Sequence, residues 1–478
     1  MNNRRFTARL ALILCFSTLP FFAQMSAMAQ NGSSDSGSQP SLTRPTVLSR
    51  PAPVPAPPAI NIPTTGTLPS LTPDAARPDA VAPEFPVVSG DLGILVQKLD
   101  GTTVMSQMAD VGFNPASAVK LATALTALRA FGPDQRFSTA VWTNGTFDKA
   151  TGTITGDLIV SGRDPSFHYE HAVMLARELN RQGIRTVTGD LIIAPKFTMN
   201  FDWSAQRSGD QLYDALDVNR RPTAASHAWN ETRVMLGDTE GGQNVPSVAV
   251  MGAVYVNSVP PNARLLLLHR SSKLVDVLKV LLCYSNNFMA ERIGDMVGGP
   301  EGVRRFLIEQ VKVSPTEVML ASTSGLGVNR VTPRAMMQVF RALRDELAKH
   351  RLSPSDILPV AGVDPGTLQK RFTSYPSRGS VIAKTGTLVR TDSGASALVG
   401  QMNTAKGETL LFVIFNMHGN ILRFRNYQDD LVTMLQNQNG RGGPAPFAYR
   451  PLTLSMRLSD TVNDPAVPAR KDEYEGTN

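Results

Sequence analysis

Residues 113–120 read Phe-Asn-Pro-Ala-Ser-Ala-Val-Lys, and an Ala- and Leu-rich run continues from there to Phe131. Apolar residues in that run recur at spacings of three and four, which predicts a buried helix that stops before Gly132. The spacing of three puts the hydroxyl of Ser117 and the amine of Lys120 on one helix face. Backbone N–H groups at a helix start stabilise a developing oxyanion. Taken alone, the same pattern also fits an N-cap serine beside a solvated lysine.

Two further short motifs offer groups of the same kind. Residues 285–287 read Ser-Asn-Asn, which places a hydroxyl and an amide before a predicted helix, although an ordinary N-cap has the same composition. Residues 384–387 read Lys-Thr-Gly-Thr after a strand-like run, with a positive charge, hydroxyls and a glycine that admits close approach of a ligand. Each motif is weak alone, but all three in this order are rare by chance.

The order S-x-x-K, S-x-N, K-T-G resembles the signature of serine β-lactamases and penicillin-binding proteins, with Asn286 where that signature has aspartate. Over roughly residues 87–436 the chain resembles the DacB-type D-alanyl-D-alanine carboxypeptidases/endopeptidases, the low-molecular-mass class C penicillin-binding proteins. The resemblance extends to Gly-Arg-Asp-Pro at 162–165, Ser-Gly-Leu at 324–326, Asn-Arg-Val-Thr-Pro at 329–333 and Leu-Pro-Val-Ala-Gly-Val-Asp at 358–364.

The resemblance implies an α/β (α+β) fold. Its core is a serine β-lactamase/transpeptidase-like domain, with an antiparallel sheet flanked by helices and a helical subdomain. We expect this catalytic domain in residues 86–135 and 255–438. Residues 136–254 should form an inserted, mainly β subdomain, because short β-like runs there are punctuated by glycine. A loosely packed tail should follow at 439–478.

Local patterns predict individual elements within this frame. Gly-Asp-Leu-Ile occurs at both 156–159 and 189–192, which indicates two similar strand entries. We expect a hairpin from 92 to 105, helices at 118–131, 169–181, 274–296, 302–311, 333–350 and 425–436, and strands at 381–383, 395–402 and 409–415.

The implied activity is that of a serine-type D-Ala-D-Ala carboxypeptidase and/or D,D-endopeptidase acting on peptidoglycan stem peptides, with β-lactams as covalent inhibitors. The resemblance assigns catalysis to Ser117 as nucleophile, Lys120 as its base and Ser285 as proton relay. A serine hydroxyl needs such a base, and a neutral lysine is a known alternative to histidine. The residues assigned to substrate are Asn287, Lys384, Thr385, Gly386 and Thr387. No cofactor and no metal are implied.

The N-terminus reads as an export signal. Residues 1–29 contain three arginines, a short apolar run and a small-x-small cleavage pattern at Ala27-Met28-Ala29, and the run is too short to span a bilayer comfortably. Cleavage there would leave no stable membrane span and a periplasmic or extracytoplasmic protein. An uncleaved anchor is the alternative. In residues 30–85 we expect a disordered spacer, because 13 of the 34 prolines fall between Pro40 and Pro86.

Composition narrows the other function classes. Loss of the signal takes the net charge from +7 to +4, spread along the chain, which is too diffuse for a nucleic-acid-binding protein. The two cysteines, Cys15 and Cys283, exclude a disulfide scaffold, and Cys283 reads as a buried thiol. His168 and His171 share a helix face, but without an evident third ligand we favour solvated helix residues over a metal site.

Two other functions stay open on the sequence. A serine β-lactamase would need fast deacylation, and a non-catalytic cell-wall scaffold on the same fold would need no nucleophile. One local departure from the family lies at 322–327, where Ser-Thr-Ser-Gly-Leu-Gly stands in place of the usual Asp-Gly-Ser-Gly-Leu-Ser. We expect thinner polar anchoring there, and higher peptide turnover on Ser322→Asp or Gly327→Ser.

Overall fold

The computed structural model describes residues 86–237, 245–374, 376–438, 442–453 and 460–462. The expected signal and spacer, residues 1–85, lie outside these residues, as does most of the expected tail. No helix in the described ranges is long and apolar enough to cross a membrane.

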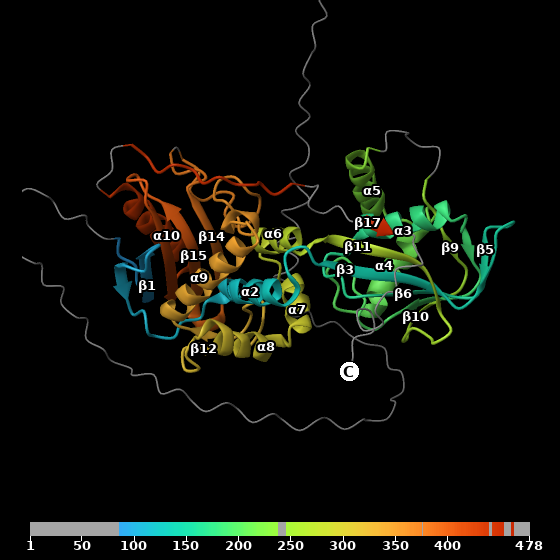
Figure 1. Cartoon of the computed structure of the whole chain (residues 1–478), viewed down its shortest axis with the longest axis horizontal. Coiled ribbons are helices and arrows are strands. Elements are labelled where there is room, and N and C mark those ends of the chain that lie inside the picture. The colour runs from blue at the N-terminus through green and yellow to red at the C-terminus, as the bar shows by residue number, and fades with distance from the viewer. Residues whose placement is uncertain (1–85, 238–244, 375, 439–441, 454–459, 463–478) are drawn as a thin grey trace, which may run out of the picture. The chain divides into compact units, whose positions relative to one another are not determined.

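A five-stranded antiparallel sheet forms the centre of the first region, with the strand order β14-β15-β16-β1-β2 (Figure 1). Alternate side chains of a strand face opposite cores: Leu95 packs into one cluster, whereas Ile94 and Val96 pack into another. Both faces of the sheet are therefore buried. The strands are β1 (Asp91–Lys98), β2 (Thr103–Gln107), β14 (Val381–Leu388), β15 (Ala395–Asn403) and β16 (Thr409–Met417).

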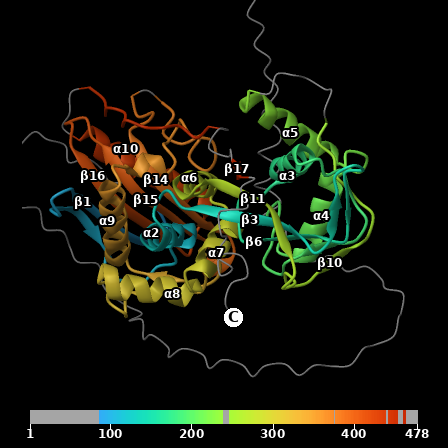
Figure 2. The same cartoon turned by 45° about the vertical axis from the view of Figure 1, so that its right-hand side comes forward.

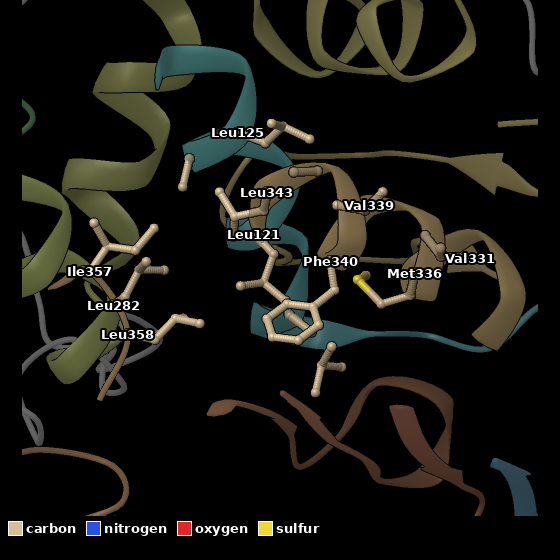
Figure 3. Close-up of a cluster of buried hydrophobic side chains, with 14 of the residues drawn as sticks. Leu121, Leu125, Leu282, Val331, Met336, Val339, Phe340, Leu343, Ile357 and Leu358 are labelled. Atoms are coloured by element: carbon tan, nitrogen blue, oxygen red, sulfur yellow. The ribbon is translucent and has the colours of Figure 1, made fainter. Parts of the chain in front are cut away.

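Helices cover the two faces of this sheet. The larger core joins α2 and α9 to one face through Leu121, Phe340 and Leu343 (Figure 3), and α10 covers the other face through Leu431 and Leu435. The helices are α2 (Lys120–Phe131), α6 (Leu274–Tyr284), α7 (Asn287–Met296), α8 (Gly299–Phe306), α9 (Pro333–Lys349) and α10 (Ile421–Asn437). Shorter elements are η1 (Ala116–Val119), η2 (Leu307–Val311), η3 (Pro354–Asp356), η4 (Thr391–Ser393), β12 (Val318–Met319) and β13 (Arg330–Val331).

The single helix expected at 274–296 is two helices. Ser285 adopts a left-handed conformation (φ 56°, ψ 41°) that ends α6, and the side chain of Asn286 accepts from Met289 N at 2.9 Å to cap α7. The break puts the Ser-Asn-Asn motif in a turn between two buried helices.

A second region is built on another sheet (Figures 1 and 2), in which the strand order is β10-β8-β6-β3-β11-β17. It contains β3 (Arg136–Thr143), β6 (Leu158–Gly162), β8 (Leu191–Ile193), β10 (Val254–Val256), β11 (Arg264–Lys273) and β17 (Asp460–Val462). The pairs β6–β8 and β8–β10 are parallel. Strand β11 pairs with β3, so this sheet continues to Lys273, past the boundary at 254 expected from the sequence. β17 falls within the expected tail.

A four-stranded sheet and three helices complete this region. The sheet has the order β4-β5-β7-β9, from β4 (Thr146–Asp148), β5 (Thr153–Thr155), β7 (Thr186–Val187) and β9 (Ala249–Val250). Helix α3 (Tyr169–Arg181) is the one predicted, whereas α4 (Ala205–Leu216) and α5 (Thr223–Met235) were not predicted.

The two Gly-Asp-Leu-Ile copies enter the adjacent parallel strands β6 and β8, with Leu158 opposite Leu191. Asp157 accepts from Asp190 N at 2.8 Å, and Asp190 in turn accepts from Ala253 N at 2.8 Å, before β10. The shared tetrapeptide therefore marks a repeated turn, in which each aspartate holds the next strand entry.

Candidate active site

Ser117 and Lys120 lie at the junction of η1 and α2, as their spacing predicts. Lys120 is fully buried, and its Nζ lies 3.0 Å from Ser117 Oγ, 2.7 Å from Asn287 Oδ1 and 2.6 Å from the Ser324 carbonyl oxygen. A neutral amine has two N–H donors and one lone pair. The three contacts fit either protonation state: an ammonium donates to all three oxygens, whereas a neutral Lys120 donates to two of them and accepts from the Ser117 hydroxyl.

The surroundings of Lys120 favour that neutral form. Burial lowers the pKa of Lys120 well below its ordinary value, and the positive charge of nearby Lys384 lowers it further. Glu291 opposes this effect, but its carboxylate accepts hydrogen bonds from the backbone of Thr323 and Ser324 instead of contacting the amine. A neutral amine can take a proton from a hydroxyl.

Ser285 and Lys384 form a second contact beside the first. Lys384 is fully buried, and its Nζ donates to Ser285 Oγ at 2.7 Å and to the Thr385 carbonyl oxygen at 2.7 Å. Burial lowers the pKa of Lys384 to about 7. The left-handed backbone of Ser285 costs about 1–2 kcal/mol for a residue with a Cβ, so packing of the surrounding chain must hold it. Backbone bonds to this turn include Thr367 N to the Cys283 oxygen.

Strand β14 is an edge strand, and only its first part is covered. Val360 pairs with Ile382, and Ala361 N donates to the Val381 oxygen at 2.9 Å. Among the described residues, the backbone bonds on this edge end at Ala383, so the edge from 384 to 388 is open to an added peptide strand.

Gly386 brings this open edge against η1, the segment that contains Ser117. A Cβ on Gly386 would press on the Pro115 oxygen and the Ala116 side chain, so only glycine lets β14 approach η1 this closely. Thr385 and Thr387 flank Gly386 on this stretch of β14, close to η1. All eight predicted site residues thus gather around one strand edge and two helix starts.

Sequence reasoning marked the loop at 322–327 only through the family resemblance, and it missed that this loop supplies the third partner of Lys120. Glu291 accepts from Ser324 N at 2.9 Å and from Thr323 Oγ1 at 2.7 Å, which fixes the loop that presents the Ser324 carbonyl. Glu291 follows Asn287 by four residues, one helical turn, so a search for polar residues on the same face of α7 would have found it.

The departure at 322–327 does not thin the polar anchoring, contrary to our expectation. Ser322 Oγ accepts from Gly325 N at 3.0 Å and donates to the Leu326 oxygen at 2.8 Å, so it bridges the turn itself. Gly327 has φ +77°, a conformation that disfavours any residue with a Cβ, serine included.

The histidine pair lies apart from these residues. His171 is buried and accepts from His168 N at 3.0 Å, and both rings pack against phenylalanines, so His171 is not the solvated residue that we expected. The described residues hold no group of three or more His, Cys, Asp or Glu side chains suited to a metal ion. Cys283 is a buried free thiol, as predicted.

Comparison with known families identifies a relationship over most of the chain. The sequence profile of the D-Ala-D-Ala carboxypeptidase 3 (S13) family matches residues 79–215 and 216–438. A carboxypeptidase of Mycobacterium tuberculosis is 27% identical over 428 residues, which cover 80% of this chain and 89% of that protein. The D-alanyl-D-alanine carboxypeptidase DacB of Haemophilus influenzae is 26% identical over 390 residues, which cover 63% and 79% of the two chains.

Solved structures share the fold. A penicillin G-acylated predatory endopeptidase of Bdellovibrio bacteriovorus has a TM-score of 0.64 at 21% identity, covering 77% of this chain and 96% of that one. Penicillin-binding protein 4 of Haemophilus influenzae, complexed with a β-lactam, has a TM-score of 0.53 at 24% identity, covering 72% and 95%. These likenesses agree with the α/β architecture expected from the sequence.

Proposed function

The chain belongs to the D-Ala-D-Ala carboxypeptidase 3 (S13) family, and we propose that it cleaves peptidoglycan stem peptides through an acyl-enzyme on Ser117. The observation that carries this proposal is the buried Lys120 amine, 3.0 Å from the Ser117 hydroxyl and bonded otherwise only to neutral acceptors. β-Lactams acylate the same serine and block it.

Acylation starts with transfer of the Ser117 proton to Lys120. The serine oxygen then attacks the carbonyl carbon of the penultimate D-Ala, and the peptide strand lies along the open edge of β14. Backbone N–H groups of Ser117 and Thr387 would stabilise the oxyanion, which is most effective in a site that excludes water. Asn287 would hold a substrate amide as well as orient Lys120.

The leaving amine needs a proton. Ser285, which accepts from Lys384, would relay to the nitrogen the proton that Lys120 took from Ser117 as the peptide bond breaks, and the terminal D-Ala or the crosslinked stem then leaves. Lys384 and Thr385 would bind the terminal carboxylate or its equivalent, with Gly386 and Thr387 completing the strand edge. Water attacks the ester on Ser117, which releases the shortened stem and restores the hydroxyl. No cofactor or metal takes part in these steps.

Labelling with a fluorescent penicillin tests the proposal against the two alternatives. We expect stoichiometric labelling and slow release, with Ser117→Ala unlabelled but folded, because the hydroxyl forms the acyl bond and contributes little packing. Fast release would instead support a β-lactamase. No labelling of folded wild type would indicate a scaffold, and a labelled Ser117→Ala variant would overturn the nucleophile assignment.

We further propose that residues 1–29 are a cleaved export signal, that residues 30–85 are a spacer and that the protein acts in the periplasm. The proposed domains are a catalytic domain before 136 and after 273, an insertion between them and a tail from 439. Support comes from the pairing of β11 with β3 and from the proline content of 40–86. A chain lacking residues 31–82 should retain wild-type carboxypeptidase activity and its thermal transition. Loss of either would show that the spacer contributes to the folded enzyme.

A further inference from the structure

Arg425 lies near the start of α10 and reaches the open edge of β14. Its Nη2 donates to Thr387 Oγ1 at 3.0 Å, and the Thr387 hydroxyl donates to the Gly386 oxygen at 2.8 Å. Gly386 lies against Pro115 and Ala116, so this contact places a guanidinium on the stretch of β14 that packs against η1, the segment that contains Ser117.

The charge of Arg425 is not matched by a contacting carboxylate. The neighbouring Arg371 binds Asp429 at 2.6 Å, but no carboxylate of the described ranges comes within 4 Å of the Arg425 guanidinium. Partial burial lowers the pKa of Arg425, and the charge of Arg371 lowers it further, although an arginine stays protonated at neutral pH. The charge of Asp429, one helical turn later, opposes this lowering of the pKa, but its carboxylate contacts Arg371. Among the described residues, the Arg425 guanidinium is therefore a permanent positive charge with no carboxylate in direct contact.

Lys384 is less suited to bind an anion on its own. Its amine already donates to Ser285 and Thr385, and burial lowers its pKa to about 7, so its charge is partial at neutral pH. A guanidinium presents paired N–H donors in the geometry of a carboxylate.

We propose that Arg425, together with the Thr387 hydroxyl, joins Lys384 and Thr385 in binding the substrate carboxylate carried on the carbon next to the scissile nitrogen. This inference rests on the proposed function, because it requires Ser117 to attack the peptide bond that precedes that carbon. Arg425 is then a specificity-determining residue that selects substrates with a free C-terminal carboxylate over those in which this group is an amide.

The test compares two substrates in three variants. An acyl-D-Ala-D-Ala peptide with a free carboxylate and the same peptide with a C-terminal amide are assayed with wild type, Arg425→Gln and Arg425→Lys. Arg425→Gln should lose roughly 10- to 100-fold in kcat/KM on the acid, the range for a charge-assisted hydrogen bond, and less than about twofold on the amide. Arg425→Lys should recover part of the loss, since it keeps the charge without the paired donors.

Arg423→Gln is the matched control, because Arg423 is an exposed arginine two residues earlier on the same helix and should leave both substrates unchanged. An equal loss on acid and amide in Arg425→Gln would make Arg425 a structural residue and overturn the proposal, as would no loss on the acid. In both cases wild type still hydrolyses peptide and is labelled by penicillin, so the proposed function stands. If wild type does neither, both proposals fail together.

Discussion

Lys120 and Lys279 are both fully buried, on the contacting helices α2 and α6, and their amines have opposite surroundings. Lys279 donates to Asp364 Oδ2 at 2.6 Å and to the Ser355 and Leu358 oxygens, each at 2.8 Å. Asp364 also accepts from Val360 N and Leu452 N, so the pair is fully satisfied. Lys120 has neutral partners only, and one of them is the serine hydroxyl.

This difference separates a structural lysine from a reactive one. A buried ammonium needs a carboxylate to offset the loss of hydration, and Lys279 has one. Lys120 has no carboxylate in contact, so burial lowers its pKa, as the proposed role of a base requires. The ion pair has a separate effect, because it fixes the loop at 358–364 whose strand-like part covers the start of β14.

The largest expected effect tests the reactive lysine. Lys120→Met should lower the rate of acylation by penicillin about 10²–10⁴-fold, because the hydroxyl loses its general base. Raising the pH should restore little, since hydroxide in solution does not occupy the position of the amine. The free energy of unfolding should change by less than about 1 kcal/mol, because lost hydrogen bonds are offset by the gain from no longer burying an amine. Stopped-flow labelling and urea denaturation measure the two quantities. Near wild-type acylation would place the base elsewhere.

The reverse outcome is expected for the structural lysine. Lys279→Met should lower the free energy of unfolding by about 3–5 kcal/mol, because it leaves Asp364 buried without its counter-charge. The acylation rate of the folded fraction should fall far less than in Lys120→Met. The double variant Lys279→Met/Asp364→Asn should recover part of the stability by removing the unpaired charge. If Lys279→Met denatures at the wild-type urea concentration, the ion pair does not have the structural role assigned to it.

An effect of intermediate size is expected for Lys384, in the pH dependence of the free energy of unfolding. Its pKa is lowered from 10.5 to about 7 by burial, so between these values the unfolded chain binds a proton that the folded chain lacks. Stability therefore rises with pH across that window. Lys384→Met abolishes this contribution, so its stability relative to wild type should be greatest at pH 7 and decline toward pH 10. Urea denaturation of both proteins at several pH values measures it, and parallel curves would contradict it.

The smallest expected effect concerns the loop that presents Ser324 to Lys120. Ser322→Asp should change peptide kcat/KM by only about twofold, because Ser322 already bridges the turn. Gly327→Ser should lower the free energy of unfolding by about 1–2 kcal/mol through its positive φ. These values replace the rise in turnover expected from the sequence. A severalfold rise in either variant would restore that expectation.

Sequence patterns predicted the elements that are determined by residues close together in the sequence. The hairpin of β1 and β2, helix α3 and the three motifs follow from periodicity, turn residues and spacing. The break at Ser285 was missed, because apolar residues continue through it and only tertiary packing stabilises a left-handed serine. The extent of the second sheet was also missed, since the pairing of β11 with β3 is non-local. Glu291 and Arg425 were not predicted as site residues, because neither belongs to one of the three motifs. Their contacts are with Thr323, Ser324 and Thr387, which are distant in the sequence.

The second region begins and ends at adjacent positions on the first region. Arg136 at the start of β3 lies directly opposite Lys273 at the end of β11, and Leu274 N donates to the Gln135 oxygen at 2.7 Å. Entry and exit are therefore one strand spacing apart, the geometry in which inserted domains are tolerated. Insertions, deletions or replacement of residues between 136 and 273 can therefore leave the position of Ser117 unchanged, because the two ends of this segment stay adjacent. The repeated aspartate turns indicate how a further parallel strand can be added to this sheet. Each turn carries an aspartate that accepts a hydrogen bond from the backbone at the start of the next strand.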